Sequence, residues 1–261
     1  MSNLSLVQIQ AFAQSLFVAG NNVRSIAPIC DDLSVADAYL VQDAFTLLQQ
    51  NRGNSLIGYK MGLTNQAKMD LANVSGPLKG QLFANMLLKD GDSLSLSELI
   101  QPRVEPEIAF VLRDELYGDD LTVVDVINAT EYITGALEIV DSRYHDFKFS
   151  FSAGIADNIC AARVVLGNEK FNPRDFDLTS IQVKLFVNQI QQAFGVSSVV
   201  LENPINSVIA LAKLLNQGGQ KLAAGSVVIT GAITDAVSIK VGDEVSAEFS
   251  QLGNIAFSVR P

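Results

Sequence analysis

The apolar residues of the first fifty positions repeat at helical spacing. One set, at positions i, i+3, i+4 and i+7, consists of Ile9, Phe12, Ala13 and Leu16. A second set follows the capping-box-like segment Ser34-Val35-Ala36-Asp37 and consists of Leu40, Ala44, Leu47 and Leu48. Gly53 is expected to end that second helix. These patterns predict two helices that pack together as an N-terminal lobe over residues 1–54.

From residue 55 onward the pattern changes to short apolar runs separated by turn residues, which is typical of strands. Strands are expected at 56–63, 132–140, 159–166 and 227–229, with a hairpin over 182–194 that turns near Asn188-Gln189. Helices are expected at 121–129 and after the N-cap Asn203-Pro204, with Val208, Leu211, Ala212 and Leu215 buried. Because strands and helices do not alternate regularly, we expect an α+β fold whose core spans residues 55–261.

The most informative polar residues lie in one of these apolar runs, Gln101-Pro102-Arg103-Val104-Glu105-Pro106-Glu107-Ile108-Ala109-Phe110. In a strand, Glu105 and Glu107 point to the same face, roughly 7 Å apart along the backbone. Glu138 is a third isolated acid in another apolar run. Carboxylates among apolar residues are costly unless they are paired or bound to a metal. The three glutamates are therefore candidate oxygen ligands for a hard cation, Mg²⁺ or Mn²⁺.

A simpler interpretation competes with the metal site. Glu105 and Glu107 could lie on a solvent-facing strand, while Glu138 forms a salt bridge with Arg103 or Arg143. Lys60 has two interpretations as well: a residue on a sheet edge that extends its ammonium to solvent, or a partly buried cation that binds an anionic substrate or moves a proton. The spacing of the residues alone leaves both questions open.

Composition narrows the class of protein. The chain has 261 residues, is 48% hydrophobic and carries a formal net charge of -10, which argues against nucleic acid or an anionic membrane as partner. Cys30 and Cys160 are too few for a disulfide framework. No signal peptide or membrane span is apparent, so we expect a cytoplasmic protein. His145, the only histidine, is expected in a surface loop.

Several segments together resemble the 2-keto-4-pentenoate hydratase and 4-oxalocrotonate decarboxylase group of the fumarylacetoacetate hydrolase superfamily. The resemblance runs from about residue 4 to residue 259. Besides the Gln101–Phe110 stretch, the segments are Gly58-Tyr59-Lys60-Met61-Gly62-Leu63-Thr64, Leu137-Glu138-Ile139-Val140-Asp141-Ser142-Arg143, Ala156-Asp157-Asn158, Ala223-Ala224-Gly225-Ser226 and Thr230-Gly231.

The resemblance implies a mixed β-barrel or β-roll core behind the helical N-terminal lobe. It implies a Mg²⁺ or Mn²⁺ site on Glu105, Glu107 and Glu138, with Lys60 as a catalytic residue. It further implies that the substrate contacts are Leu82, Asp157 and Cys160. Arg143 is expected to orient an acid from behind the ligands. Homo-oligomers are common in the family, and a complex with a sister hydratase or decarboxylase is also expected.

The resemblance favours the decarboxylase branch. Hydratases carry an acid in a P-D-F-G segment, whereas this chain has Pro77-Leu78-Lys79-Gly80, and a leucine cannot transfer a proton. Ala67-Lys68-Met69 looks like the decarboxylase version, although Gln101-Pro102-Arg103 is shared with hydratases. Leu201-Glu202-Asn203-Pro204 departs from the usual L-G-H-P, and Cys160 stands where serine is usual. These departures concern the exact substrate more than the chemistry.

The expected function is metal-dependent decarboxylation of 2-oxo-3-hexenedioate (4-oxalocrotonate), as in meta-cleavage catabolism of aromatic compounds. The cation would act as a Lewis acid on the 2-oxo acid end of the substrate. The alternative is hydration of 2-hydroxypenta-2,4-dienoate to 4-hydroxy-2-oxopentanoate. A further alternative is an inactive subunit that stabilises a partner enzyme, which the intact glutamates disfavour. A carbon–carbon hydrolase is less well supported, because no His–Glu pair is evident.

Overall fold

The structure, a computed structural model, describes residues 4–29, 32–72, 74 and 76–261. Its α-helices are α1 (Leu6–Asn21), α2 (Val35–Asn51), α3 (Gln66–Ala72), α4 (Val123–Ala129), α5 (Phe151–Ala156) and α6 (Pro204–Gln217). Its strands are β1 (Leu56–Gly62), β2 (Leu78–Phe83), β3 (Leu87–Lys89), β4 (Ser93–Ser95), β5 (Arg103–Leu112), β6 (Thr130–Val140), β7 (Ala161–Leu166), β8 (Gln182–Val187), β9 (Ile190–Val196), β10 (Val227–Ile229), β11 (Val237–Ser238), β12 (Glu244–Phe249) and β13 (Gly253–Arg260). Helices and mixed sheets together confirm the α+β class.

The strands form two sheets. The larger has the order β2-β1-β10-β5-β6-β7-β3 and contains both parallel and antiparallel neighbours. The short strand β11 pairs with the first residues of β5, Arg103 and Val104. The smaller has the order β4-β13-β12-β8-β9. The β8–β9 hairpin turns at Asn188 and Gln189, both with positive φ, as the sequence predicted. The long antiparallel pair of β5 and β6 is the part of the larger sheet that carries the acidic residues.

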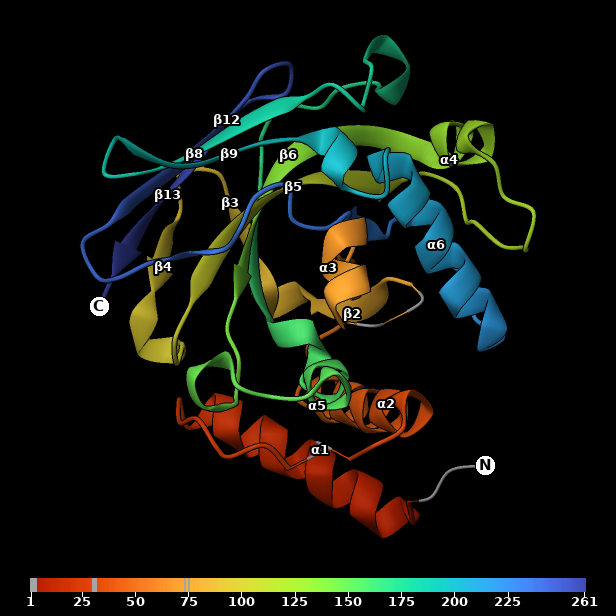
Figure 1. The fold of residues 1–261 in the computed structure, drawn as a ribbon, viewed down its shortest axis with the longest axis vertical. Coiled ribbons are helices and arrows are strands. Elements are labelled where there is room, and N and C mark those ends of the chain that lie inside the picture. The colour runs from red at the N-terminus through yellow and green to blue at the C-terminus, as the bar shows by residue number, and fades with distance from the viewer. Residues whose placement is uncertain (1–3, 30–31, 73, 75) are drawn as a thin grey trace.

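The two faces of the larger sheet bury different hydrophobic clusters. On one face, residues such as Val104, Ile108 and Leu137 pack with α6 and the smaller sheet. On the other face, Ala109 and Ala136 pack with α1 and α2. Figure 1 shows α1, α2 and α5 gathered at one end of the molecule. Helices α1 and α2 therefore share a hydrophobic core with the sheet and form a layer on it. The division of the chain into an N-terminal lobe, 1–54, and a catalytic core, 55–261, stays a prediction.

The first predicted helix buries the expected face, whereas the second does not. In α1, Ile9, Ala13 and Leu16 are buried. In α2, Leu40 and Leu47 are 40% and 60% exposed, whereas Ala44 and Leu48 are partly buried against the core, so the predicted face is wrong for two of its four residues. The helix instead buries a neighbouring stripe, consisting of Asp37, Ala38, Val41, Gln42, Phe45 and Thr46.

The buried face of α2 was not predicted because it contains polar residues, whose hydrogen bonds form only in the folded chain. The side-chain amide of Gln42 donates to the carbonyls of Lys79 and Ile155. A buried amide with partners costs far less than an unpaired one. Hydrophobic spacing alone could not anticipate those partners, because they come from distant segments.

Helix α6 follows its prediction. Asn203 caps it, Val208, Leu211 and Leu215 are buried, and it ends at Gly218. Among the described residues, one helical stretch, Ser197–Gln217, is long and apolar enough by length and composition alone to cross a membrane. That stretch contains α6, whose buried face belongs to the hydrophobic core and accounts for its apolar composition.

Candidate metal centre and active-site pocket

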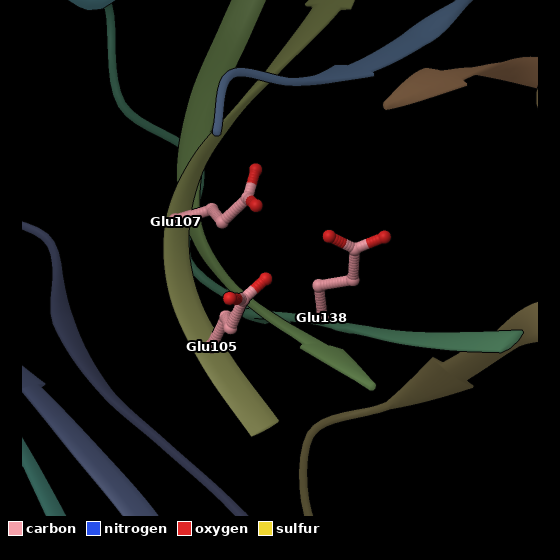
Figure 2. A group of neighbouring side chains, drawn as sticks. All are labelled: Glu105, Glu107 and Glu138. Atoms are coloured by element: carbon pink, nitrogen blue, oxygen red, sulfur yellow. The ribbon is translucent and has the colours of Figure 1, made fainter. Parts of the chain in front are cut away.

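The antiparallel register of β5 and β6 brings the three predicted glutamates together. Glu105 lies directly opposite Glu138, and Glu107 lies two residues farther along β5 on the same face. Figure 2 shows the three side chains converging on one space. Each offers a carboxylate oxygen within 4.8 Å of the others. The alternation predicted for the strand therefore holds, and the partner strand supplies the third acid.

The carboxylates are poorly compensated by protein groups. Glu107 and Glu138 are fully buried, and Glu105 is partly exposed. One Glu107 oxygen accepts the Gly231 N–H at 2.6 Å, while its other oxygen and Oε1 of Glu138 have no hydrogen-bond partner in the described part of the chain. The alternative of a solvent-facing strand is wrong for Glu107. Buried oxygens that lack donors suit a hard divalent cation, which binds carboxylate oxygen and retains room for water or substrate.

The same crowding shifts the acid equilibria. Burial raises the pKa of Glu105 to about 7 even though Lys60 favours its ionised form. Burial, together with the charge of Glu138, raises the pKa of Glu107 well above its ordinary value. The cause in both cases is removal of a carboxylate from water beside another carboxylate. A bound dication would supply the missing positive charge.

Lys60 is the counter-ion within this cluster. Its ammonium lies 2.8 Å from Oε2 of Glu138 and donates to the Ile159 carbonyl at 3.1 Å. Lys60 is 3% exposed on β1, between β2 and β10, so the interpretation as an edge residue is wrong. The alternative that pairs Glu138 with Arg103 or Arg143 is also wrong. Burial alone would lower the pKa of Lys60, but the three carboxylates, Glu138 first, raise it above its ordinary value.

A left-handed turn supplies the carbonyl that Lys60 contacts. Asn158, Ile159 and Cys160 have φ values of 54°, 50° and 59°. Such a conformation is strained for a β-branched isoleucine and is held only by its surroundings. Here the Asn158 side chain is bonded to both backbone groups of Gln81 on β2. The strain is consistent with a turn whose backbone is placed for a functional contact.

Glycine is required where the chain passes closest to the site. Gly231 has φ +111°, and a Cβ on it would lie 2.0 Å from Oγ1 of Thr64. Its N–H is the donor to Glu107. The Thr230-Gly231 motif was recognised in the sequence without a role, and the structure shows what the glycine does. It lets the backbone after β10 reach the carboxylate.

The predicted role of Arg143 beside an acid corresponds to a buried ion pair. The Arg143 guanidinium lies 3.0 Å from Oδ1 of Asp157 and also donates to the carbonyls of Asp157 and Ala161. Oδ2 of Asp157 accepts from the Ser142 hydroxyl. This network anchors both ends of the turn at Asn158–Cys160. Arg143 thus positions the turn rather than one of the three glutamates.

The pocket beside the carboxylates has a volume of about 270 Å³. Its walls are Lys60, Met61, Gly62, Leu63, Thr64, Asn65, Lys68, Arg103, Glu105, Val140, Phe147, Ile159, Cys160, Ala232 and Ala236. Of the three predicted substrate contacts, only Cys160 lines it. Burial raises the pKa of the Cys160 thiol well above its ordinary value, so the thiol stays uncharged where it lines the pocket.

The other two predicted contacts lie elsewhere. Leu82 is 1% exposed and packs in the hydrophobic cluster that α1 and α2 share with the sheet. Asp157 is buried in its pair with Arg143. Neither lines the pocket. The structure gives them packing and anchoring contacts, and their contact with a substrate stays a prediction. His145 is exposed and hydrogen-bonded to Ser25 at 2.6 Å, as expected of a loop residue. Cys30 lies outside the described residues.

Comparison with known proteins places this site in a family. The model of the fumarylacetoacetate (FAA) hydrolase C-terminal family matches residues 60–260, which include all three glutamates and Lys60. The chain belongs to the fumarylacetoacetate hydrolase family. The family match begins at Lys60 and spans the strands of both sheets.

Relatives that match over nearly their whole length carry two kinds of name. The chain is 34% identical to 4-oxalocrotonate decarboxylase of Pseudomonas putida, over 97% of each chain. It is 37% identical to 2-keto-4-pentenoate hydratase 1 of Dechloromonas aromatica (strain RCB), over 98% of each. It also resembles the solved 4-oxalocrotonate decarboxylase from Pseudomonas putida G7 complexed with magnesium and adipate, with a TM-score of 0.96 and 33% identity, covering 99% of this chain and 100% of that one.

Proposed function

We propose that this enzyme is a divalent-metal-dependent lyase that decarboxylates 2-oxo-3-hexenedioate to 2-hydroxypenta-2,4-dienoate and CO₂. The observation that carries the proposal is the cluster of Glu105, Glu107 and Glu138 with Lys60 beside a pocket of about 270 Å³. Support comes from decarboxylase relatives over the full chain, one of them bound to magnesium and a six-carbon dicarboxylate. We place the enzyme in the cytoplasm, with Mg²⁺ or Mn²⁺ as its cation.

The carboxylates, Lys60 and the apolar walls of the pocket have separate roles in this reaction. A divalent cation bound by the three carboxylates supplies Lewis-acid stabilisation of the negative charge that develops on the substrate oxygens. Lys60 stays protonated beside Glu138, so its Nζ serves as a cation and proton donor rather than a base. The apolar walls at Met61, Val140 and Ile159 keep bulk water from the reacting carbons.

The reaction balances without an added oxidant or reductant. The bond between C5 and C6 breaks and C6 leaves as CO₂. Its electrons form the C4–C5 double bond, the C3–C4 π electrons move to C2–C3, and the ketone π electrons move onto O2. A proton then joins O2, and we assign the role of donor to Nζ of Lys60, which lines the pocket beside the carboxylates. Stabilising charge at O2 in a site that excludes water is the main way such a barrier is lowered.

A second candidate is the hydration of 2-hydroxypenta-2,4-dienoate, because the hydratase relative is 37% identical over nearly the whole chain. The decarboxylase is preferred because the position of the hydratase acid is Leu78. That side chain is 7% exposed and packs with Ala38 and Ile155. It can neither transfer a proton nor hold a water molecule through hydrogen bonds.

The test is a substrate panel with purified enzyme, Mg²⁺ and each 2-oxo acid, monitored by ultraviolet absorbance and by CO₂ release. We expect CO₂ from 2-oxo-3-hexenedioate, loss of that activity with a chelator, and recovery when Mg²⁺ is restored. Glu107→Gln should remove both metal binding and CO₂ release. Hydration of the dienoate without any CO₂ from the enedioate would replace this proposal with the alternative.

A further inference from the structure

Arg103 occupies the same face of β5 as the carboxylate cluster. Residues 103, 105 and 107 are spaced by two, so their side chains share one side of the strand. The Arg103 backbone is fixed between Val140 of β6 and Ser238 of β11. Its guanidinium lies 4.2 Å from the centre of the Phe147 ring, and both residues line the pocket. A stacked guanidinium is held in place while its edges remain available.

The guanidinium binds no carboxylate of the residues that the structure describes. Among the described residues, no side-chain hydrogen bond or ion pair of Arg103 is formed, in contrast to Arg143 and Arg163. Arginine presents five N–H donors in a planar fork that matches a carboxylate in a bidentate manner. A pocket wall that holds an unused fork is suited to an anionic ligand.

Lys68 adds a second cation to the wall of this pocket. It lies on α3, and its ammonium is 2.8 Å from Asp235. Their side chains are 48% and 89% exposed, so the pair contributes little stability and exchanges readily for another anion. Lys68 lines the same pocket as Arg103 and Glu105. Arg103, Lys68 and Asp235 together carry one net positive charge.

The spacing fits a short dicarboxylate. Arg103 precedes Glu105 by two residues, which is about 7 Å along an extended strand. The two carboxyl carbons of a six-carbon diacid are roughly 6 Å apart when the chain is extended, from ordinary bond lengths. A ligand whose 2-oxo acid end lies at the glutamates therefore reaches Arg103 with its other end.

We propose that Arg103, assisted by Lys68, is the specificity subsite for the far carboxylate of a dicarboxylic 2-oxo acid. The inference rests on the proposed function and deepens it, because it states which 2-oxo acids the pocket selects. The cations favour substrates with a second carboxylate over monocarboxylates of equal length.

The subsite also predicts that KM and kcat respond differently to its removal. The far carboxylate loses its charge as CO₂ leaves, so the cations strengthen binding of the substrate more than of the transition state. Arg103→Met should raise KM without lowering kcat in proportion.

The direct test uses two saturated probes, 2-oxohexanedioate and 2-oxohexanoate, which differ only in the far carboxylate and lack the alkene through which electrons would flow. Their dissociation constants are measured by calorimetry with Mg²⁺ present. We expect wild type to prefer the diacid by about tenfold or more, the worth of one charge-assisted contact. Arg103→Met should remove that preference and leave the monoacid within about twofold of wild type. Lys68→Met should remove part of it.

Two further variants make the result decisive. Arg103→Lys keeps the charge and should restore part of the preference for the diacid. Arg113→Met is the matched control, since Arg113 is an exposed arginine just beyond the other end of β5, and it should change neither constant. Failure of both acids to bind wild type would defeat the proposed function itself. Binding of both acids with equal affinity, or equal loss of both in Arg103→Met and Arg103→Lys, would overturn the subsite and leave the proposed function standing.

Discussion

Replacing Glu107 by glutamine should make the metal-free protein more stable while abolishing its response to metal. The side chain is fully buried, and one of its oxygens accepts the Gly231 N–H while the other has no hydrogen-bond partner among the residues described. Glutamine has nearly the same shape, and its carbonyl can still accept that N–H. The substitution therefore removes a negative charge and leaves the packing in place.

The magnitude follows from the geometry. Ligand oxygens of the three glutamates lie within 4.8 Å of one another, and two like charges at that distance repel by about 3.5 kcal/mol at an effective dielectric constant near 20. Glu107 faces two such charges, Glu105 and Glu138, and Lys60 offsets about one of them. The net cost of its charge is thus about 3 kcal/mol, and uptake of a proton relieves part of it. We expect metal-free Glu107→Gln to be about 1–3 kcal/mol more stable than wild type at pH 8.

The pH dependence has a definite sign. Burial raises the pKa of Glu107 well above its ordinary value, so folded wild type retains a proton that the unfolded chain has lost. Stability of metal-free wild type therefore falls as pH rises above about 4.5, by up to about 1.4 kcal/mol per pH unit for one such group. The variant lacks this loss, so its advantage should grow from pH 6 to pH 8.

The assay is urea unfolding of chelator-treated protein at pH 6 and pH 8, repeated with Mg²⁺. At a metal concentration 100 times the dissociation constant, wild type should gain about 2.7 kcal/mol, whereas the variant should gain little. The order of stability then reverses. Glu131→Gln, an exposed glutamate on β6, is the matched control and should change stability by less than about 0.5 kcal/mol. A metal-free Glu107→Gln less stable than wild type, or equal metal gains for both proteins, would refute the reasoning.

Three other outcomes follow from the same contacts. Lys60→Met leaves Glu138 buried without its cation, so it should lower metal-free stability by about 3–5 kcal/mol in urea unfolding. It should also lower the rate of CO₂ release by roughly 100-fold or more. The control Lys184→Met, at an exposed lysine, should change neither quantity. Mg²⁺ affinity should rise from pH 6 to pH 8, because the metal displaces a proton from Glu105, whose pKa is about 7. Calorimetric titrations at the two pH values measure this affinity. An unchanged affinity would contradict the proposal that Glu105 binds the metal. Leu78→Asp buries a carboxylate among apolar side chains, so its stability should fall more steeply with rising pH than that of Leu78→Ala. Parallel pH profiles of the two variants would show that position 78 is not buried.

The features that proved predictable are those governed by near neighbours in the chain. Strand alternation places Glu105 and Glu107 on one face because successive side chains point in opposite directions. Asn203 caps α6, and Asn188-Gln189 turns the β8–β9 hairpin, because short polar side chains and left-handed turns act within a few residues. The same local reasoning gave a wrong face for α2, where the burial of Gln42 depends on carbonyls far away in the sequence.

The sequence by itself determined the α+β class, three acids suited to a hard cation, and the family to which the chain belongs. Only the tertiary structure decided which charges meet. The β5–β6 register set Glu138 opposite Glu105, and β1 carried Lys60 to Glu138 rather than to a sheet edge. It also stacked the Arg103 guanidinium on Phe147 in a pocket wall, with no carboxylate partner among the described residues. The physical reason is that ion pairing depends on distances of a few ångströms between segments far apart in the chain, and residue type and spacing do not encode those distances.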